Sequence, residues 1–237
     1  MGKKKSSSLY RQIIKRVLDI ILSAIALLFL AIPMAIIALM IKRDMGSPVI
    51  FRQERIGKNE RPFMLLKFRS MRTAFDEYGV PLPDEQRITP LGRTIRKLSL
   101  DELPSLINIF RGDMSIVGPR PLPTNYLPWF KEDERIRHQV RGGLTGLAQV
   151  NGRNTSTWED RFKYDRQYVQ NLTFFLDLKI VLKTVKVVLE HKDIGARGLD
   201  APPDFHVYRS GMSERELIVG DNKNASEKAL DVKRQRT

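Results

Sequence analysis

A long uncharged apolar run is the first feature of the chain. From Ile20 to Ile41 the sequence IILSAIALLFLAIPMAIIALMI has Ser23 as its only polar side chain. This length is close to the ~20 residues that a helix needs to cross a bilayer. A helix in a large core can also be apolar all round, but a chain of 237 residues is short for such a core. No small-residue cleavage site follows the run, unlike in a secretory signal peptide. The pattern therefore predicts a membrane helix.

Basic residues flank this run on both sides, and a proline interrupts it. Lys15 and Arg16 precede the run and Lys42 and Arg43 follow it, so both ends carry the positive charge that favours the cytoplasmic side. Pro33 lies inside the run, where proline commonly bends or breaks a helix. Two topologies are open. One is a re-entrant helix broken at Pro33, and the other is a simple span, in which proline is tolerated. The two basic flanks favour the re-entrant helix.

The rest of the pattern predicts short strands among several helices, an α+β fold that is mainly helical. Gly112 is a typical residue at a helix C-terminus. Thr157 and Asp160 have capping-box spacing, so a helix is expected to begin at residue 158. The expected elements are two strands paired as a hairpin, at residues 49–53 and 63–69, helices at 91–97, 101–112 and 158–172, and a strand in SIVGPRP.

The segment LDLKIVLKTVKVVLE predicts a further helix with two faces. One face carries lysines, and the other is apolar. The lysines are Lys179, Lys183 and Lys186, and the apolar residues are Leu178, Val181, Leu182, Val185, Val188 and Leu189. Two interpretations are open: an amphipathic helix packed on a core, or a helix on the membrane surface with its lysines toward anionic lipid. These patterns divide the chain into a basic N-terminus and membrane helix (1–43), a cytosolic domain (44–195), and an extended segment with a mobile tail (196–237).

The charge balance narrows the class of partner. The chain has 41 Lys and Arg against 27 Asp and Glu, a net charge of +14. Such a charge calls for nucleic acid, anionic lipid or a phosphorylated substrate. No nucleic-acid-binding motif is present in the sequence, so we expect no nucleic acid, and a membrane helix favours the other two. Cysteine is absent, which excludes a disulfide framework and fits a reducing, cytosol-facing domain.

Two adjacent acids in KLSLDELPSL are the strongest candidates for chemistry. If Asp101 is a helix N-cap, Pro104 falls in the first turn, and both Asp101 and Glu102 face the positive end of the helix dipole. That is a sufficient structural reason for the pair. A helix N-terminus also lowers carboxylate pKa values and attracts phosphate, so the same acids can serve as an ionised nucleophile or a metal ligand. The two interpretations are compatible.

Arginines near predicted turns are the remaining candidates for a phosphate site. Pro119 and Pro121 restrict the backbone on both sides of Arg120, which suits a fixed bidentate contact. Exposed arginines are usually only solvated, so each of the others is a weaker candidate. The other arginines at expected turns and element ends are Arg69, Arg96, Arg141 and Arg153.

Five motifs in order carry a family resemblance. They are KRVLDI before the apolar run, KFRSM, LSLDELPSLINIFRGDMSIVGPRPL, LTGLAQVNGRN followed by WEDRFKYDRQYV, and LDLKI. Together they resemble the small bacterial sugar transferases, the monotopic phosphoglycosyl transferases that begin glycan assembly on polyprenyl phosphate. The likeness is greatest to the member that starts bacterial N-glycan assembly. It extends from about Lys15 to about Asp193, and the tail lies outside it.

The resemblance implies a reaction and a site. A UDP-sugar gives its sugar 1-phosphate to undecaprenyl phosphate and releases UMP, at the cytoplasmic face of the bacterial inner membrane. Asp101 is then the nucleophile that forms a covalent aspartyl phosphosugar, and Glu102 holds Mg²⁺. It also implies a re-entrant helix broken at Pro33 and membrane phospholipid as a partner, and it leaves a homodimer open. The substrate-binding residues expected in this site are Arg69, Arg96, Pro119, Arg120, Pro121 and Arg153.

The chain departs from the family's pattern at two places. Ile32 stands where relatives often have serine before the proline, so the expected break lacks a hydroxyl for the freed backbone groups. Gly142 gives RGG in place of the common RPG, which predicts a looser loop. Two other functions remain as alternatives: a non-catalytic, membrane-anchored basic protein, and a transferase that moves the sugar without its phosphate. The sequence does not identify the sugar.

Overall fold

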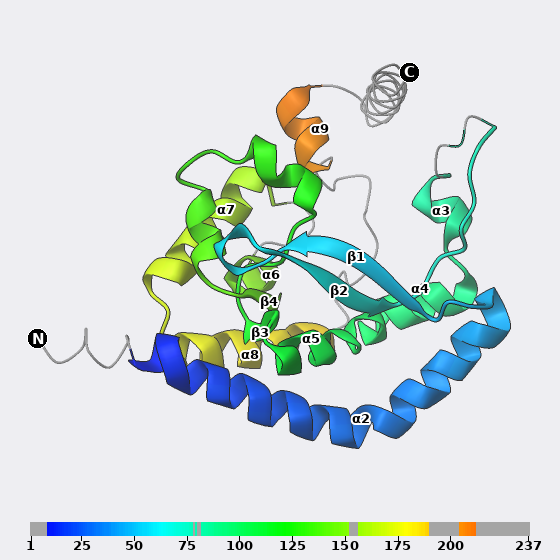
Figure 1. The fold of residues 1–237 in the computed structure, drawn as a ribbon, viewed down its shortest axis with the longest axis horizontal. Helices are drawn as coiled ribbons and strands as arrows, with labels where there is room; N and C mark the ends of the chain where they lie inside the picture. Colours follow the sequence, from blue (N-terminus) through cyan, green and yellow to red (C-terminus); the bar gives the residue numbers. More distant parts are fainter. Residues whose placement is uncertain (1–8, 78, 80–81, 152–155, 190–203, 212–237) are drawn as a thin grey trace, which may run out of the picture.

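The computed structural model describes residues 9–77, 79, 82–151, 156–189 and 204–211, which form a mainly helical fold with a few short strands (Figure 1). The predicted fold class is confirmed in this respect. In chain order the elements are a π-helical turn η1 (Tyr10–Ile14), α2 (Lys15–Met45), β1 (Ile50–Ile56), η2 (Lys58–Glu60), β2 (Pro62–Phe68), α3 (Asp84–Arg87), α4 (Pro90–Lys97), η3 (Leu100–Glu102), α5 (Ser105–Arg111), β3 (Met114–Val117), η4 (Thr124–Trp129), η5 (Arg135–Gln139), β4 (Gly142–Thr145), α6 (Leu147–Asn151), α7 (Trp158–Gln170), α8 (Phe174–Leu189) and α9 (Phe205–Ser210).

The long apolar run forms one helix, α2. Pro33 lies inside it, and the helix continues on both sides of that residue. Figure 1 shows α2 bent partway along its length under the domain. A proline inside a helix is the usual cause of such a bend, because its nitrogen donates no hydrogen bond. The helix does not end at Pro33, so the predicted break is not confirmed.

One side of α2 packs on the domain, and the other side is uncovered. Ile41 is fully buried, whereas Leu28, Phe29 and Ile32 are each at least 75% exposed. Within the described part of the chain, Tyr10–Met45 is the one helix long and apolar enough to cross a membrane, and an 18-residue stretch of it has a mean hydropathy of 2.9. An apolar face of this size left in water is unfavourable. The helix is therefore consistent with membrane anchoring.

The strands form two small sheets. In the first, β1 and β2 pair antiparallel, with Ile50 opposite Phe68, which confirms the predicted hairpin. In the second, β3 and β4 pair parallel, with Met114 opposite Gly142. The sequence predicted β3 but not β4, because a run of glycines lacks the branched and aromatic residues typical of strands.

The start of α5 differs from the prediction. Asp101 and Glu102 lie in the 3-10 turn η3, and α5 itself begins at Ser105 after Pro104, so Asp101 is not its N-cap. The Ser105 hydroxyl donates to the carbonyl of Leu66 at 2.9 Å. The helix ends as predicted at Gly112, whose φ of 98° is in the left-handed region that glycine tolerates.

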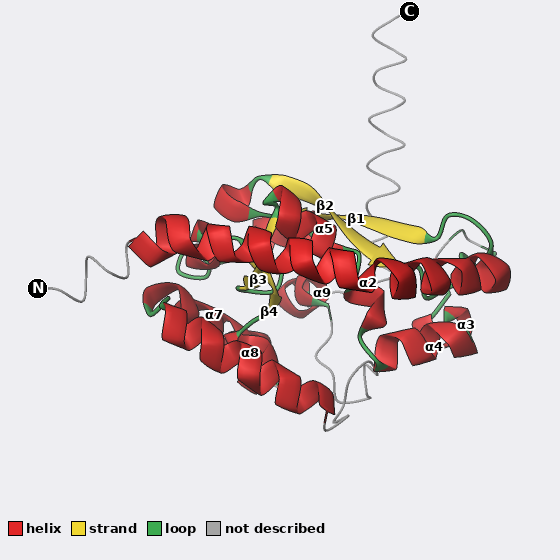
Figure 2. Cartoon of the chain, turned by 90° about the horizontal axis from the view of Figure 1, so that it is seen from below, coloured by secondary structure: helices red, strands yellow, loops and turns green. Residues whose placement is uncertain are grey.

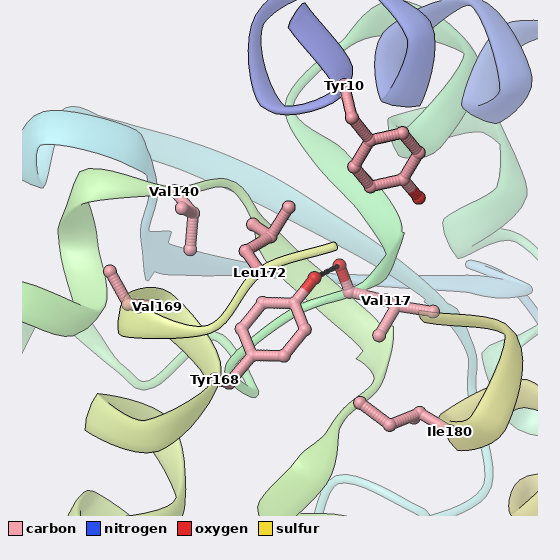
Figure 3. Packing of buried hydrophobic residues seen from close by; sticks show 7 residues of the cluster. All are labelled: Tyr10, Val117, Val140, Tyr168, Val169, Leu172 and Ile180. Atoms are coloured by element: carbon pink, nitrogen blue, oxygen red, sulfur yellow. Dashed lines mark hydrogen bonds between the residues drawn. The ribbon is translucent and has the colours of Figure 1, made fainter. Parts of the chain in front are cut away.

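A buried carboxylate, Asp177, ties the start of α2 to the end of the domain. It accepts hydrogen bonds from the Tyr10 hydroxyl at 2.6 Å, from the Lys15 ammonium at 2.6 Å and from the Tyr168 hydroxyl at 2.8 Å. Figure 3 shows the surrounding cluster, in which the single O–H of Tyr168 is shared between Asp177 and the carbonyl of Val117, 3.0 Å away. Residues from η1, β3, α7 and α8 thus share one core.

Helix α8 has an uncovered apolar face. Ile180 and Asp177 are buried, but Leu178, Leu182 and Val185 are exposed. Val181, on the same predicted face, packs against the core, so the interpretation of a helix packed on a core holds for that residue but not for these three. Figures 1 and 2 place α2 and α8 on the same side of the molecule. The two helices with exposed apolar residues thus lie on one side of the molecule.

The structure corrects the prediction for part of the C-terminal segment. Where we expected extended chain after residue 195, α9 spans Phe205–Ser210. Phe205 is fully buried in an aromatic cluster, and Arg209 forms an ion pair with Glu134 at 2.5 Å. The rings around Phe205 are those of Tyr126, Phe130, Trp158 and Phe162. The remaining residues of 196–237, apart from Asp204 and Gly211, lie outside the described chain.

Candidate active site

The two acids lie beside two cations. The Lys67 ammonium and the Arg120 guanidinium both donate to Oε1 of Glu102, at 2.7 and 2.8 Å. Lys67 also lies 3.9 Å from Oδ2 of Asp101. The side chain of Asp101 is 14% exposed and that of Arg120 is 49% exposed, so the acids are sheltered while the arginine extends toward solvent. The four charges form one compact, nearly neutral group.

A small open cavity lies next to this group, lined by Lys67, Glu102 and Arg120. Its walls come from both sheets, from the N-terminal part of α5 and from the turn that carries Arg120. The other lining residues are Arg55, Leu65, Ser105, Met114, Pro121, Gly143 and Leu144.

The surroundings shift the pKa values of the two acids in opposite directions. Burial raises the pKa of Asp101, as does the neighbouring Glu102, and Lys67 only partly offsets them. Burial would also raise the pKa of Glu102, but Arg120 and Lys67 outweigh it and lower that pKa to about 2. The pKa of Lys67 is lowered by burial and by Arg120. A pair of acids with separated pKa values is typical of sites where the two have different roles.

The 3-10 turn explains how the two adjacent acids come to lie beside the cations. In a 3-10 turn, side chains three residues apart lie on the same side. Leu100 and Leu103 have this spacing, and both pack against the cluster that α2 forms with the domain. The acids between them are thereby turned toward Lys67 and Arg120. Ser99, just before the turn, has a φ of 55°, a strained value for a residue other than glycine.

The turn that carries Arg120 is held by its neighbours on both sides. The Pro119 carbonyl accepts from the Gly143 N–H at 2.9 Å, and the Leu122 carbonyl accepts from the Ile56 N–H at 2.9 Å. Gly142 is buried, and a Cβ on it would lie 2.4 Å from Cγ of Pro121. The looser loop predicted at Gly142 is therefore wrong, because that residue is part of β4 and packs closely against the turn.

Comparison with known proteins identifies the family. A family model described as bacterial sugar transferase matches residues 10–191. The chain belongs to this family. The bacterial sugar transferase is 47% identical over 182 residues to EpsL of Bacillus subtilis (strain 168), named as an uncharacterized sugar transferase, covering 77% of this chain and 90% of that protein.

Two further relatives have more specific names. The exopolysaccharide production protein ExoY of Rhizobium meliloti (strain 1021) is 38% identical over 73% of this chain and 84% of its own length. The UDP-glucose:undecaprenyl-phosphate glucose-1-phosphate transferase of Caulobacter vibrioides is 40% identical over 74% of this chain and 69% of its own length. This bacterial sugar transferase is therefore an enzyme, and the alternative of a non-catalytic anchored protein is set aside.

The arginines predicted from the transferase sequence have different positions. Arg120 contacts Glu102 as expected, with Pro119 and Pro121 beside it. Arg96 is close enough to lower the pKa of Asp101, but its Nε donates to the Ser70 hydroxyl. Arg69 is not brought to the acids; it donates to the carbonyls of Met71, Met45 and Ser47. Arg141 donates to the Gly112 carbonyl at the end of α5. Arg153 lies outside the described residues.

Sequence reasoning missed Lys67. It belongs to KFRSM, but the arginine of that motif was chosen instead. The available signal was strand periodicity, since residues two apart in a strand face the same side. Leu65 is buried, and Lys67 follows it by two in β2, so both line the cavity.

The acid pair fits a metal that arrives with substrate phosphates. Among the described residues, no group of three or more His, Cys, Asp and Glu side chains is placed to hold a metal ion. Mg²⁺, however, is usually bound through only one or two carboxylates, together with water and phosphate oxygens. The charges of Asp101 and Glu102 are already balanced by Lys67 and Arg120, so a diphosphate needs further positive charge. A divalent cation would supply it.

Proposed function

We propose that this transferase moves sugar 1-phosphate from a UDP-sugar to undecaprenyl phosphate and releases UMP, as the first membrane step of glycan assembly. The Caulobacter vibrioides relative is named for this reaction with UDP-glucose, and ExoY is named for exopolysaccharide production. We carry over the reaction class and leave the donor sugar open.

One observation carries the proposal: the acid pair lies between two leucines that pack against the apolar helix α2. Leu100 and Leu103, which flank Asp101 and Glu102, pack with α2 residues such as Ile37 and Ile41. A lipid phosphate at the membrane surface and a nucleotide sugar from solution can therefore both approach the same carboxylate. A site for a wholly soluble substrate pair would gain nothing from this position.

In the first step, an ionised oxygen of Asp101 attacks the β-phosphorus of the UDP-sugar. The bond from that phosphorus to the oxygen shared with the α-phosphate breaks, and UMP leaves with the bonding electrons. In the second step, a phosphate oxygen of undecaprenyl phosphate attacks the same phosphorus. The bond to Asp101 then breaks, which restores the carboxylate and yields the undecaprenyl diphosphate sugar.

The neighbouring charges suit this sequence. The raised pKa of Asp101 makes its carboxylate more basic, which favours attack on phosphorus. Arg120 has a half-exposed guanidinium, which can contact a phosphate while it remains beside Glu102. Mg²⁺, held by Glu102 and substrate phosphates, would neutralise charge on the diphosphate. Arg120 and Lys67 lower the pKa of Glu102 and so keep it ionised for that role.

We further propose that the enzyme lies on the cytoplasmic face of the inner membrane, with α2 re-entrant. The basic flanks of α2 support this orientation. The bend in α2 and the uncovered apolar residues of α8 support a helix pair in one leaflet (Figure 2). Lys179, Lys183 and Lys186 line a groove beside these residues and suit anionic phospholipid headgroups. A homodimer stays a prediction.

The test uses a donor labelled in its β-phosphate. We expect the label to enter the lipid fraction while UMP is released, and Asp101→Asn to abolish both without unfolding the protein. Asp133→Asn, at an exposed surface acid, is the matched control and should keep full activity. Near-normal UMP release by Asp101→Asn would refute the nucleophile assignment. Label that stays in the aqueous fraction while the sugar reaches lipid would mean transfer without phosphate.

A further inference from the structure

The inference concerns what holds Arg120 in place, and it rests on the proposed function. The Arg120 side chain is half exposed, and its turn has no regular secondary structure. The position of its guanidinium therefore depends on how firmly the backbone of the turn is fixed. The Arg120 carbonyl itself accepts a hydrogen bond from Nη2 of Arg137, in η5, at 2.7 Å.

Arg137 is a deeply buried charge. Its Nε donates to Oδ2 of Asp165, on α7, at 2.9 Å, and both side chains are only 4% exposed. The guanidinium packs against two aromatic rings that also contact each other, with Cζ 5.6 Å from the centroids of both Phe130 and Phe162. One arm of the guanidinium thus holds Asp165, while the other holds the Arg120 backbone.

Packing alone does not account for this pair. Taking two charges out of water is costly, and replacing a buried ion pair by apolar side chains of similar size is often neutral or stabilising. Phe130 and Phe162 already provide an apolar site that a hydrocarbon side chain would fill. What a hydrocarbon cannot do is donate a hydrogen bond to the Arg120 carbonyl.

The same short element is fixed from another side. Arg135 and His138, which flank Arg137 in η5, both contact Glu60 in the turn between β1 and β2, at 2.8 and 3.2 Å. The turn carrying Arg120 is also bonded to β1 through Ile56. Arg137 therefore projects from an element that is attached to the same hairpin as the turn it contacts.

We propose that Arg137, oriented by Asp165, is a positioning residue for the transfer reaction: it fixes the backbone of Arg120 so that the guanidinium meets Glu102 and the donor phosphate. It touches no substrate. Its effect on the reaction passes through Arg120, and this separates it from a residue that only stabilises the fold.

The test is a double-mutant cycle on the full chain, with UMP release as the activity. Arg137→Met combined with Asp165→Leu removes the charges and keeps the volume. We expect thermal unfolding close to that of the wild type and a kcat/KM lower by about 100-fold, the scale of a misplaced catalytic group. In an Arg120→Ala background, the same pair of substitutions should lower kcat/KM by less than about twofold, since little remains to be positioned.

The matched control is another sheltered ion pair, that of Arg209 with Glu134 on the aromatic cluster. Arg209→Met with Glu134→Leu should leave kcat/KM within about twofold of the wild type. If the Arg137 and Asp165 double variant does not fold, Arg137→Lys is tested in its place in the same double-mutant cycle. It keeps the buried charge, but an ammonium group cannot donate to both Asp165 and the Arg120 carbonyl in the fixed geometry of a guanidinium. An equal loss in both Arg120 backgrounds, or no loss, overturns the inference.

A second measurement does not depend on turnover. Hydrogen exchange followed by mass spectrometry should show faster exchange in the Arg137 and Asp165 variant of the peptides that contain Ile56 and Gly143, whose N–H groups donate to the Leu122 and Pro119 carbonyls of the turn, and unchanged exchange there in the control. Unchanged exchange in both variants would also overturn the inference. If the wild type releases no UMP from any donor, the proposed function fails, and this measurement still decides whether Arg137 fixes the turn.

Discussion

Replacing Phe205 by Ala should destabilise the whole catalytic domain, although this residue lies beyond the segment matched by the family model. The Phe205 side chain is fully buried, with four aromatic rings at centroid distances of 5.0 to 5.6 Å. Truncating such a side chain loses its transfer free energy and leaves a cavity, together ~3–5 kcal/mol. That is a large share of a typical total stability of ~5–15 kcal/mol.

This loss of stability can be measured as a decrease in melting temperature. For a domain of this size, ~1 kcal/mol corresponds to ~2–4 °C, so we expect Phe205→Ala to melt about 6–20 °C lower. Trp129 and Trp158 both belong to the aromatic cluster, so intrinsic fluorescence in detergent follows unfolding at this location.

Tyr208→Ala is the control from the same short helix. Tyr208 is 43% exposed, and its hydroxyl donates to Glu159 at 2.9 Å. Its loss should lower the melting temperature by less than half as much. Equal shifts for the two variants, or no shift for Phe205→Ala, would refute the placement of α9 in the domain core.

Three further predictions concern the metal, the pH dependence and the membrane. Glu102→Gln should lower kcat by about 100-fold or more and raise the Mg²⁺ concentration needed for half-maximal activity; unchanged kcat with full sensitivity to a chelator would place the metal elsewhere. Burial and the adjacent Arg137 lower the pKa of His138 to about 4, so the neutral imidazole contributes its full stability above the ordinary pKa of about 6.5, and this stability is lost as pH falls toward 4. The free energy of unfolding should therefore fall between pH 7.5 and pH 5 by ~2 kcal/mol more in the wild type than in His138→Gln. An equal fall in the two proteins would contradict the pKa shift. The chain has no native cysteine, so single introduced cysteines can be probed separately. Ser6→Cys and Ser213→Cys should both be protected from an impermeant thiol reagent in intact spheroplasts, and labelling of Ser6→Cys alone would mean that α2 spans the bilayer. A fluorophore on Leu182→Cys should be quenched by quenchers carried in the lipid, and an unquenched fluorophore would exclude α8 from the membrane face.

Local patterns were sufficient where short-range physics decides the structure. The hairpin of β1 and β2 follows from alternation and from turn residues between the strands. The start of α7 follows from Thr157, whose hydroxyl accepts from the Asp160 N–H as a capping box predicts. The acid pair was found because both acids are adjacent in the chain, and Arg120 because two prolines mark its turn.

The errors arise where distant segments decide the structure. Leu100 and Leu103 pack against α2, and this contact makes the acid pair part of a 3-10 turn instead of a helix N-terminus. Arg69 has the composition of a phosphate ligand, but it lies close enough to the end of α2 to bind the Met45 carbonyl. Helix α9 exists because Phe205 meets rings that are 43 or more positions earlier in the chain, as the contact with Phe162 illustrates. No local pattern contains these contacts.

The hydrogen bond between Tyr10 and Asp177 also has a consequence for biosynthesis, because it joins residues 167 positions apart. Chains grow at ~5–20 residues per second, so Asp177 is made about 8–33 s after Tyr10. An apolar helix that inserts into a membrane as it is made would do so before Asp177, the carboxylate that fixes its first turn, exists. The interval is shorter for Arg16, because the carbonyl to which it donates, that of Ile109, is only 93 positions later in the chain. The helix would therefore be held first by lipid alone and later also by its contacts with the folded domain.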